Sequence, residues 1–331
     1  SGVRSIASMK HVGLNVASHA VMTLAYTGIV GGMVIVVCDD PSMYSSQNEQ
    51  DTRYFAVNSK LPLLDAGSPQ EAKDMTVEAF ELSEKLELPI ILRLTTRVCH
   101  GKGRVKLGRI QKLDRKGEFD KNSLRWTMIP ANARRQLRIL NEKVIEARKL
   151  VEESKFNFIE DNGKEVGIVG SGIGYYHARS VLDKSQFSWL KLGFVYPFPA
   201  GLVKKFASKV NKIVVVEELR PFIEERIRCL GIEILGKDKS GLEEVDEFTP
   251  EIVRNAFANL GLCEKQKEQQ EELRLPPRPP VLCPGCPHRA FFYSLKKVKR
   301  DAIIAGDIGC YTLGVLPPQH AIQTCLLYTS D

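Results

Sequence analysis

Short apolar runs alternate with amphipathic stretches along most of the chain, and this alternation limits the possible folds more than any other feature. The run at 33–37 has no polar residue, so a strand formed there has both faces covered, as in a parallel sheet. Parallel strands need long crossover connections, which the amphipathic stretches supply as helices. We therefore predict an α/β protein built from successive open parallel-sheet domains.

The individual elements follow from the same patterns. Strands are predicted at 5–9, 33–37, 61–64, 89–94, 166–169, 190–194 and 212–216. Helices are predicted at 17–26, 69–86, 131–154, 175–182, 200–208, 222–230 and 290–297. Ser68 is predicted to cap the second helix, because a serine followed by proline is typical of a helix start.

These elements group into three domains. We predict an α/β domain at 1–125, a connecting helix at 126–160, a second α/β domain at 161–263, a linker at 264–280 and the start of a third domain at 281–331. The linker is charged and then rich in proline. The last segment has room for two strands at most, too few for a stable sheet, and a strand opens directly after Ser1. We therefore expect both outer domains to be cut short.

Composition limits the classes of function. The net charge is +7, but the densest basic run, 134–138, belongs to a mixed-charge helix, so we expect no nucleic-acid partner. The longest apolar run, 29–38, is far below the roughly 20 residues that span a bilayer, so no membrane association is expected. Eight irregularly spaced cysteines do not form a secreted disulfide pattern, which favours a cytoplasmic location.

Polar residues follow three of the predicted strands. Open α/β sheets bind ligands at the carboxyl ends of their strands, so these residues are candidate site residues. His11 follows the first strand, the polar loop 45–51 follows the second, and Arg97 follows the fourth. Each has a structural alternative: packing or capping for His11, turn formation for the loop, and a salt bridge for Arg97, which otherwise suits a carboxylate.

Two further sequences resemble functional motifs less closely. The glycine-rich run 170–174 lacks the G-x-G-x-x-G spacing, so a tight strand-to-helix turn is predicted, with NAD binding as the weaker alternative. Glu217 and Glu218 follow a predicted strand and are expected to be exposed and solvated rather than to act as acid and base.

The cysteines near the end of the chain form the most distinctive motif. Cys283-Pro284-Gly285-Cys286 must be bent, because proline and glycine separate the two thiols. Cys310 follows a Gly-Asp-Ile-Gly turn and the apolar run 302–305, which we predict to be a buried strand. The three thiols could hold zinc or an iron–sulfur cluster, could include a redox pair, or could be close in sequence by coincidence. A fourth ligand is not evident.

Several long sequence strings, in the right order, resemble the alpha subunit of indolepyruvate:ferredoxin oxidoreductase, a thiamine-diphosphate-dependent 2-oxoacid oxidoreductase. The similarity covers roughly residues 6–324. Its strongest parts are 9–15, 45–51 with Arg53, 92–98, 283–289 and 306–314.

This resemblance implies a pyrimidine-binding domain, a transketolase C-terminal-like domain and the start of a diphosphate-binding domain. It implies oxidative decarboxylation of arylpyruvates to aryl-acetyl-CoA, with electrons passing through [4Fe-4S] clusters to ferredoxin. Thiamine diphosphate and Mg²⁺ would be cofactors, coenzyme A a substrate, and a smaller beta subunit a partner. His11 and Arg97 are the catalytic candidates. The cofactor-binding candidates are Asn15, Gln47, Asn48, Cys283, Pro284, Gly285, Cys286, His288, Arg289, Gly306, Asp307, Gly309 and Cys310, of which Cys283, Cys286 and Cys310 are also the metal candidates.

The chain departs from the family pattern in three places. The activating glutamate is expected upstream of Ser1, and the Gly-Asp-Gly magnesium motif and a cluster domain are expected downstream of 331. Residues 325–331 do not fit the pattern and resemble translated adapter sequence. We therefore expect the chain to be an internal fragment that is inactive by itself.

Overall fold

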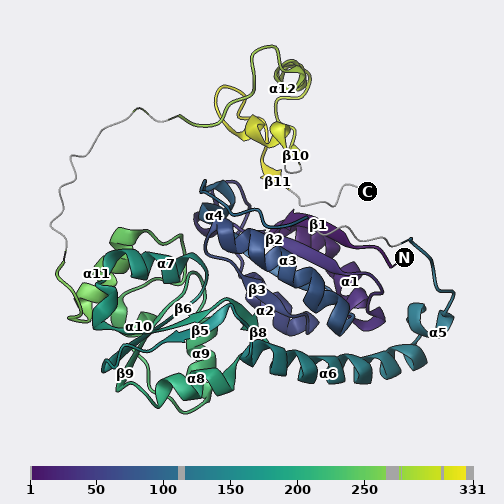
Figure 1. The fold of residues 1–331 in the computed structure, drawn as a ribbon. Coiled ribbons are helices and arrows are strands. Elements are labelled where there is room, and N and C mark those ends of the chain that lie inside the picture. The colour runs from purple at the N-terminus through teal and green to yellow at the C-terminus, as the bar shows by residue number, and fades with distance from the viewer. Residues whose placement is uncertain (1, 111–115, 266–275, 277, 307–308, 326–331) are drawn as a thin grey trace. The chain divides into compact units, whose positions relative to one another are not determined.

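A computed structural model describes residues 2–110, 116–265, 276, 278–306 and 309–325. The chain divides into two compact units, Ser1–Lys267 and Glu268–Asp331, which are described separately. The protein is an α/β protein, and its first unit contains two mixed, mostly parallel sheets (Figure 1). The predicted fold class is confirmed in this respect. No helix in the described ranges is both long and apolar enough to cross a bilayer.

The first sheet has the strand order β1-β2-β4-β3-β8. Its strands are β1 (Ser5–Lys10), β2 (Met33–Asp39), β4 (Ile90–Thr95), β3 (Leu63–Asp65) and β8 (Phe194–Tyr196). The first four run parallel, and β8 pairs antiparallel with β3. The helices of this part are α1 (His11–Thr27), α2 (Thr52–Ser59), α3 (Pro69–Leu86), α4 (Thr96–His100) and α5 (Ser123–Trp126). Helix α3 packs on β2 and β4.

The second sheet has the order β5-β7-β6-β9. Its strands are β5 (Asn157–Glu160), β7 (Ser188–Leu192), β6 (Val166–Gly170) and β9 (Lys212–Val216), with β5 antiparallel to β7 and the others parallel. Its helices are α7 (Gly172–Val181), α8 (Ala200–Ala207), α9 (Phe222–Cys229), α10 (Lys237–Ser240) and α11 (Pro250–Asn259), and the long α6 (Pro130–Glu152) precedes the sheet.

One short passage of chain joins the two sheets. The predicted strand 190–194 is in fact two strands, because the chain leaves the second sheet after Leu192 and enters the first at Phe194. Buried Asn157 fixes this crossing: its Oδ1 accepts hydrogen bonds from Gly193 N and Phe194 N, each at 2.8 Å. One hydrophobic cluster contains residues of both sheets, so they share a core.

The predicted helix boundaries differ most at α1. It begins at His11, six residues before the predicted start at 17, because burial of His11, Val12 and Leu14 outweighs the weak helix propensity of Gly13 and Asn15. Helix α3 matches its prediction, and Ser68 Oγ accepts from Glu71 N at 3.2 Å. Helix α2, strand β5 and helix α11 were not predicted. The start of α11 did carry a signal, because Thr249 precedes Pro250 and caps the helix by accepting from Ile252 N at 3.3 Å.

The second unit is small. It contains α12 (Pro287–Val298), a short parallel pair of β10 (Ala305–Gly306) and β11 (Thr324–Cys325), and a 3₁₀ helix at Cys310–Val315. Its core consists of Leu282, Phe292, Ala321 and Ile322. The prediction of a buried strand at 302–305 is wrong, since Ile303 is 84% exposed. The strand that forms there, β10, has only two residues and pairs with the two residues of β11. So short a pair does not bury the run that precedes it.

Candidate functional site

The carboxyl ends of β1, β2 and β4 lie next to one another, because these three strands are adjacent and parallel. Strand β1 leads directly into His11, β2 ends at Asp39 and is followed by Asp40, and β4 leads into Arg97 on α4. The structure therefore brings to one sheet edge the residues that the strand-end argument selected. This edge of the first sheet is the candidate site.

His11 is buried at the first position of α1. Its Nε2 donates a hydrogen bond to the backbone oxygen of Asn48 at 3.0 Å, which joins two predicted site residues from different loops. Its Nδ1 is buried and has no hydrogen-bond partner among the described residues. A buried polar atom without a partner is unusual and marks a position where a bound group can complete the pairing.

The loop after β2 folds back over the start of α1. Lys10 Nζ donates to Asp40 Oδ2 at 3.0 Å and to Ser45 Oγ at 2.7 Å. Burial opposes ionisation of Asp40, but hydrogen bonds from Ser46, Ser45 and Lys10 outweigh it and lower the pKa of its carboxyl. The loop is thus held at the sheet edge by an ionised aspartate.

Asn15 and Gln47 lie near this edge with different exposure. Asn15 is exposed on α1 one turn after His11, whereas Gln47 is half-buried in the loop beside Asn48. Asn48 Oδ1 accepts from Gln50 Nε2 at 2.6 Å, so its side chain braces the loop. Roles of these residues in cofactor binding stay predictions.

Arg97 forms the salt bridge that was its structural alternative. Its Nη2 lies 2.9 Å from Oε1 of Glu247, and the hydroxyl of Tyr44 donates to the same oxygen at 2.6 Å. Glu247 lies three residues before α11, one of the helices that accompany the second sheet. The salt bridge therefore links the candidate site on the first sheet to the region around the second sheet. The Arg97 side chain keeps 38% exposure and already binds a carboxylate, which shows that it can reach one.

Behind the exposed edge lies a buried charge network that the sequence reasoning missed. Arg93, inside β4, donates from Nε to Asp39 Oδ2 at 2.6 Å and from Nη1 to Asp65 Oδ1 at 2.9 Å. Asp39 also accepts from Thr52 N at 3.1 Å, which holds the start of α2. An arginine within the otherwise apolar run 90–94 was the available signal, because a charge on a buried strand requires a partner.

Arg53 extends this network to the second sheet. It is fully buried and donates to Asp51, to the Glu217 carboxylate and to the backbone oxygens of Glu218 and Arg220, the last two at 2.8 and 2.9 Å. The expectation that Glu217 and Glu218 are exposed is therefore wrong. Both are 4% exposed or less, because β9 ends against the first sheet's part of the unit.

The carboxyls of this network differ in pKa. Burial opposes ionisation of Asp51, but the Arg53 guanidinium outweighs it and lowers the pKa of Asp51. Burial raises the pKa of Glu217 despite Arg53, and it raises the pKa of Glu218 to about 7, although Phe248 N donates to Glu218 at 2.9 Å. Glu218 therefore titrates near neutral pH.

The run 170–174 forms the predicted tight turn between β6 and α7. Its Gly172 has φ +52° and its carbonyl lies against Gly67, which follows β3. A Cβ on Gly67 would lie 2.0 Å from that oxygen. Only glycine at position 67 therefore lets the two loops, and the sheets from which they extend, approach this closely.

The cysteine loop lies in the second unit. Cys286 N donates to Cys283 O at 3.1 Å across Pro284 and Gly285, and Gly285 has φ +75°, a conformation that favours glycine. Cys286 occupies the N-cap position of α12 without a side-chain capping bond, and its Sγ lies 3.3 Å from His288 Nδ1. Arg289 turns back and donates from Nε to Leu282 O at 3.1 Å.

The remaining cofactor candidates of this unit are only partly described. Cys310 is exposed and starts the 3₁₀ helix, while Gly306 ends β10 and Gly309 precedes Cys310. Asp307 lies outside the described residues. No group of three or more His, Cys, Asp or Glu side chains in the described ranges is arranged to hold a metal ion. The described cysteines thus do not fit a cluster as they stand, and metal binding stays a prediction.

Comparison with known proteins found similarity to subunits of indolepyruvate oxidoreductases. No family model matches it. It is 42% identical over 343 residues to the indolepyruvate oxidoreductase subunit IorA of Methanothermobacter thermautotrophicus, covering 98% of this chain and 56% of that subunit. It is 43% identical over 352 residues to the IorA of Pyrococcus abyssi, covering 98% and 54%. The chain thus spans about half the length of the curated relatives it matches.

The fold has a solved counterpart. A 2-oxoglutarate:ferredoxin oxidoreductase from Magnetococcus marinus, determined with 2-oxoglutarate, coenzyme A and succinyl-CoA bound, superposes with a TM-score of 0.56. The match covers 77% of this chain and 52% of that one at 14% identity, so it shows a shared fold. The sequence matches carry the relationship further: this chain is a homologue of the IorA subunit of indolepyruvate oxidoreductases and corresponds to about half of that subunit.

Proposed function

We propose that the protein to which this chain belongs is a subunit of an indolepyruvate:ferredoxin oxidoreductase, which oxidatively decarboxylates arylpyruvates to aryl-acetyl-CoA. The observation that carries the proposal is the 42% identity to IorA over 98% of the chain. A smaller beta subunit and ferredoxin would be its protein partners. We also propose a cytoplasmic location, because the cysteine spacing favours a reducing compartment.

Thiamine diphosphate with Mg²⁺ would supply the carbanion chemistry that removes carbon dioxide from a 2-oxo acid. In the chain itself, the buried Nδ1 of His11, which has no partner among the described residues, can accept a hydrogen bond from a cofactor or substrate group at the sheet edge. Arg97 offers its guanidinium to the substrate carboxylate in place of Glu247. Asn15, Gln47 and Asn48 line the same region. The three cysteines are not gathered as a ligand set among the described residues, so the proposal gives them no electron-transfer step.

A chimera tests this function. This chain would replace the aligned segment of the Methanothermobacter thermautotrophicus IorA, which would be produced together with its smaller subunit. We expect a dye reduction that requires both indolepyruvate and coenzyme A, because the chimera regains the parts of the subunit that this chain does not span. A chimera that assembles like the parent enzyme but reduces no dye would refute the proposal.

Structural zinc at the cysteine loop is the alternative. Metal analysis of the anaerobically purified chain separates the two: iron with sulfide indicates a cluster, and zinc alone indicates a structural site.

A further inference from the structure

Two cysteines that are far apart in the sequence meet beside the candidate site. Cys38 is the penultimate residue of β2, and Cys99 lies on α4, which directly follows β4. Strands β2 and β4 pair in parallel as far as Asp39 and Thr95, and α4 packs on β2. The Cys99 thiol donates a hydrogen bond to the Cys38 sulfur, and both cysteines are free thiols.

The packing of α4 on the sheet end holds this contact in place. Thr96 Oγ1, at the start of α4, donates to Asp40 Oδ1 at 2.9 Å, which fastens the helix to the residue two positions beyond Cys38. Val98 is buried and anchors the same turn. Cys99 is three residues after Thr96, so it lies on the same side of the helix, facing the end of β2.

The two thiols differ in reactivity. The hydrogen bond from Cys99 lowers the pKa of the Cys38 thiol, and Lys10, its partner in register on β1, acts in the same direction against burial and Asp39. The same hydrogen bond raises the pKa of Cys99, and burial adds to the effect. Because the thiolate is the nucleophilic form, Cys38 is the thiol that reacts first. Cys99 is exposed and stands next to it as the second reactant.

We propose that Cys38 and Cys99 form a modification site that hydrogen peroxide converts to a disulfide. The Cys38 thiolate attacks one peroxide oxygen, the O–O bond breaks, and the leaving oxygen takes up a proton and departs as water. Cys38 is then a sulfenic acid. The Cys99 sulfur attacks the Cys38 sulfur, the S–O bond breaks, and the hydroxide leaves as water with the Cys99 proton. Two thiols lose two electrons, and one peroxide becomes two waters.

The disulfide would restrain α4. This helix has only five residues, so hydrogen bonds and packing at its ends hold it, and few bonds of its own do. Arg97 precedes Cys99 by two residues, and Asp39 and Asp40 follow Cys38 directly. Oxidation therefore fixes Arg97's helix to the sheet edge of the candidate site. Disulfides of reducing compartments are mostly transient and redox-sensing, which suits a reversible bond of this kind. The proposal rests on contacts within the first unit and not on the activity proposed above.

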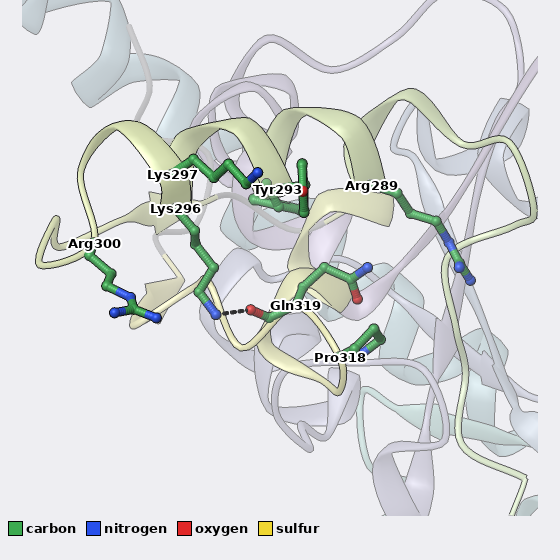
Figure 2. Close-up of a pocket in the computed structure, with 8 residues that line it drawn as sticks. Arg289, Tyr293, Lys296, Lys297, Arg300, Pro318 and Gln319 are labelled. Carbon is green, nitrogen blue, oxygen red and sulfur yellow. Dashed lines mark hydrogen bonds between the residues drawn. The ribbon is translucent and has the colours of Figure 1, made fainter.

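The second unit also carries exposed thiols, but no thiol–thiol hydrogen bond joins the described ones. Cys283 and Cys310 are exposed, and Cys286 Sγ lies against His288 Nδ1. The cavity of about 550 Å³ beside α12 is lined by several cations and, among the described residues, by no cysteine (Figure 2). Oxidation in this unit can be distinguished from the proposed reaction because each disulfide is identified by the two peptides that it joins.

Peptide mapping of the oxidised protein tests the proposal. The reduced 331-residue chain would be treated with hydrogen peroxide, its remaining thiols alkylated, and its peptides mapped by mass spectrometry. We expect a peptide pair joined through Cys38 and Cys99, lighter by two hydrogen atoms than the two reduced peptides and separated by dithiothreitol. Amide hydrogen exchange across α4 should slow by about tenfold or more on oxidation, whereas exchange across α9 should not change.

Single variants separate the two steps. Cys99→Ser removes the second thiol, so the reaction should stop at the Cys38 sulfenic acid, which dimedone traps. Cys38→Ser removes the reactive thiolate and should slow the oxidation of Cys99 by about tenfold or more. Cys229→Ser is the matched control, because Cys229 is exposed on α9 and its thiol has no hydrogen-bond partner among the described residues. This control should leave the yield of the Cys38–Cys99 disulfide unchanged.

Three results would overturn the proposal. The first is that Cys38 and Cys99 stay free under a peroxide treatment that oxidises Cys229. The second is that Cys99 joins Cys229 or Cys263 as often as it joins Cys38, which would indicate random pairing in unfolded protein. The third is dimedone labelling of Cys38 in Cys99→Ser that is no greater than the labelling of Cys229 in the same sample.

Discussion

Replacing Arg53 with glutamine should destabilise the first unit severely. Arg53 is fully buried between Asp51 and Glu217, which are themselves fully buried. The variant would remove the cation that pairs with both carboxylates, leaving Asp51 only the more distant Arg93, at 4.0 Å. Glutamine is also too short to replace the contacts of Arg53 with the backbone oxygens of Glu218 and Arg220. Removing one partner of a buried ion pair costs about 3–5 kcal/mol in the free energy of unfolding.

Urea unfolding measures this loss. Trp189 is fully buried in the second sheet, so its fluorescence reports unfolding of the unit, and a Trp126→Phe background removes the other tryptophan signal. With a urea dependence of about 3 kcal/mol/M, the Arg53→Gln midpoint should fall by about 1 M or more.

Arg97→Gln is the matched control. It also removes an arginine that links the two sheets' parts of the unit, but its salt bridge with Glu247 is partly exposed and should contribute about 0–1 kcal/mol. In the double variant Arg53→Gln/Glu217→Gln, one uncompensated charge is gone and part of the loss should be recovered. Equal midpoints for Arg53→Gln and Arg97→Gln would refute the argument that burial makes the difference.

Three further predictions concern the same unit. Gly67→Ala should lower the thermal midpoint strongly, since its Cβ would lie 2.0 Å from Gly172 O, while Gly103→Ala, whose nearest contact is 3.5 Å away, should be nearly neutral in the same melting experiment. Glu218 has its pKa raised to about 7 from 4.5, so the folded state holds its proton and stability should fall as pH rises from about 4.5 to 7. This component, at most about 3 kcal/mol, should be missing from urea titrations of Glu218→Gln across that pH range. In the active chimera, Arg97→Gln should raise KM for indolepyruvate about tenfold or more with assembly unchanged; an unaltered KM would remove Arg97 from the site.

The sequence predicted the parallel strands well because each carries its own evidence. The runs that became β2, β4 and β9 are apolar enough to require two covered faces, and the structure shows them buried. Strand β5 could not be found in this way, since it has only four residues at the sheet edge and Asn157 alone among them is buried. The break between β7 and β8 falls at Gly193, and a glycine inside a strand run can mark such a bend. The side chain that fixes the break, Asn157, comes from more than 30 positions away.

The candidate site was predictable where it depends on position along the chain. Strand ends selected His11 and the loop containing Asn48, and the structure places the two in contact. The Arg53–Glu217 pair was not predictable, because the two residues are 164 positions apart and only the packing of the two sheets brings them together. Glu217 was predicted to be solvated, because nothing in the neighbouring sequence indicates that another part of the chain covers the end of β9.

Substrate preference tests the proposed function most directly. We would measure kcat/KM of the chimeric enzyme for indolepyruvate and for 2-oxoglutarate, with coenzyme A and ferredoxin present. The account predicts that indolepyruvate is preferred by at least about tenfold, a difference in activation free energy of about 1.4 kcal/mol. Preference for 2-oxoglutarate, or turnover of neither acid by a correctly assembled chimera, would contradict it.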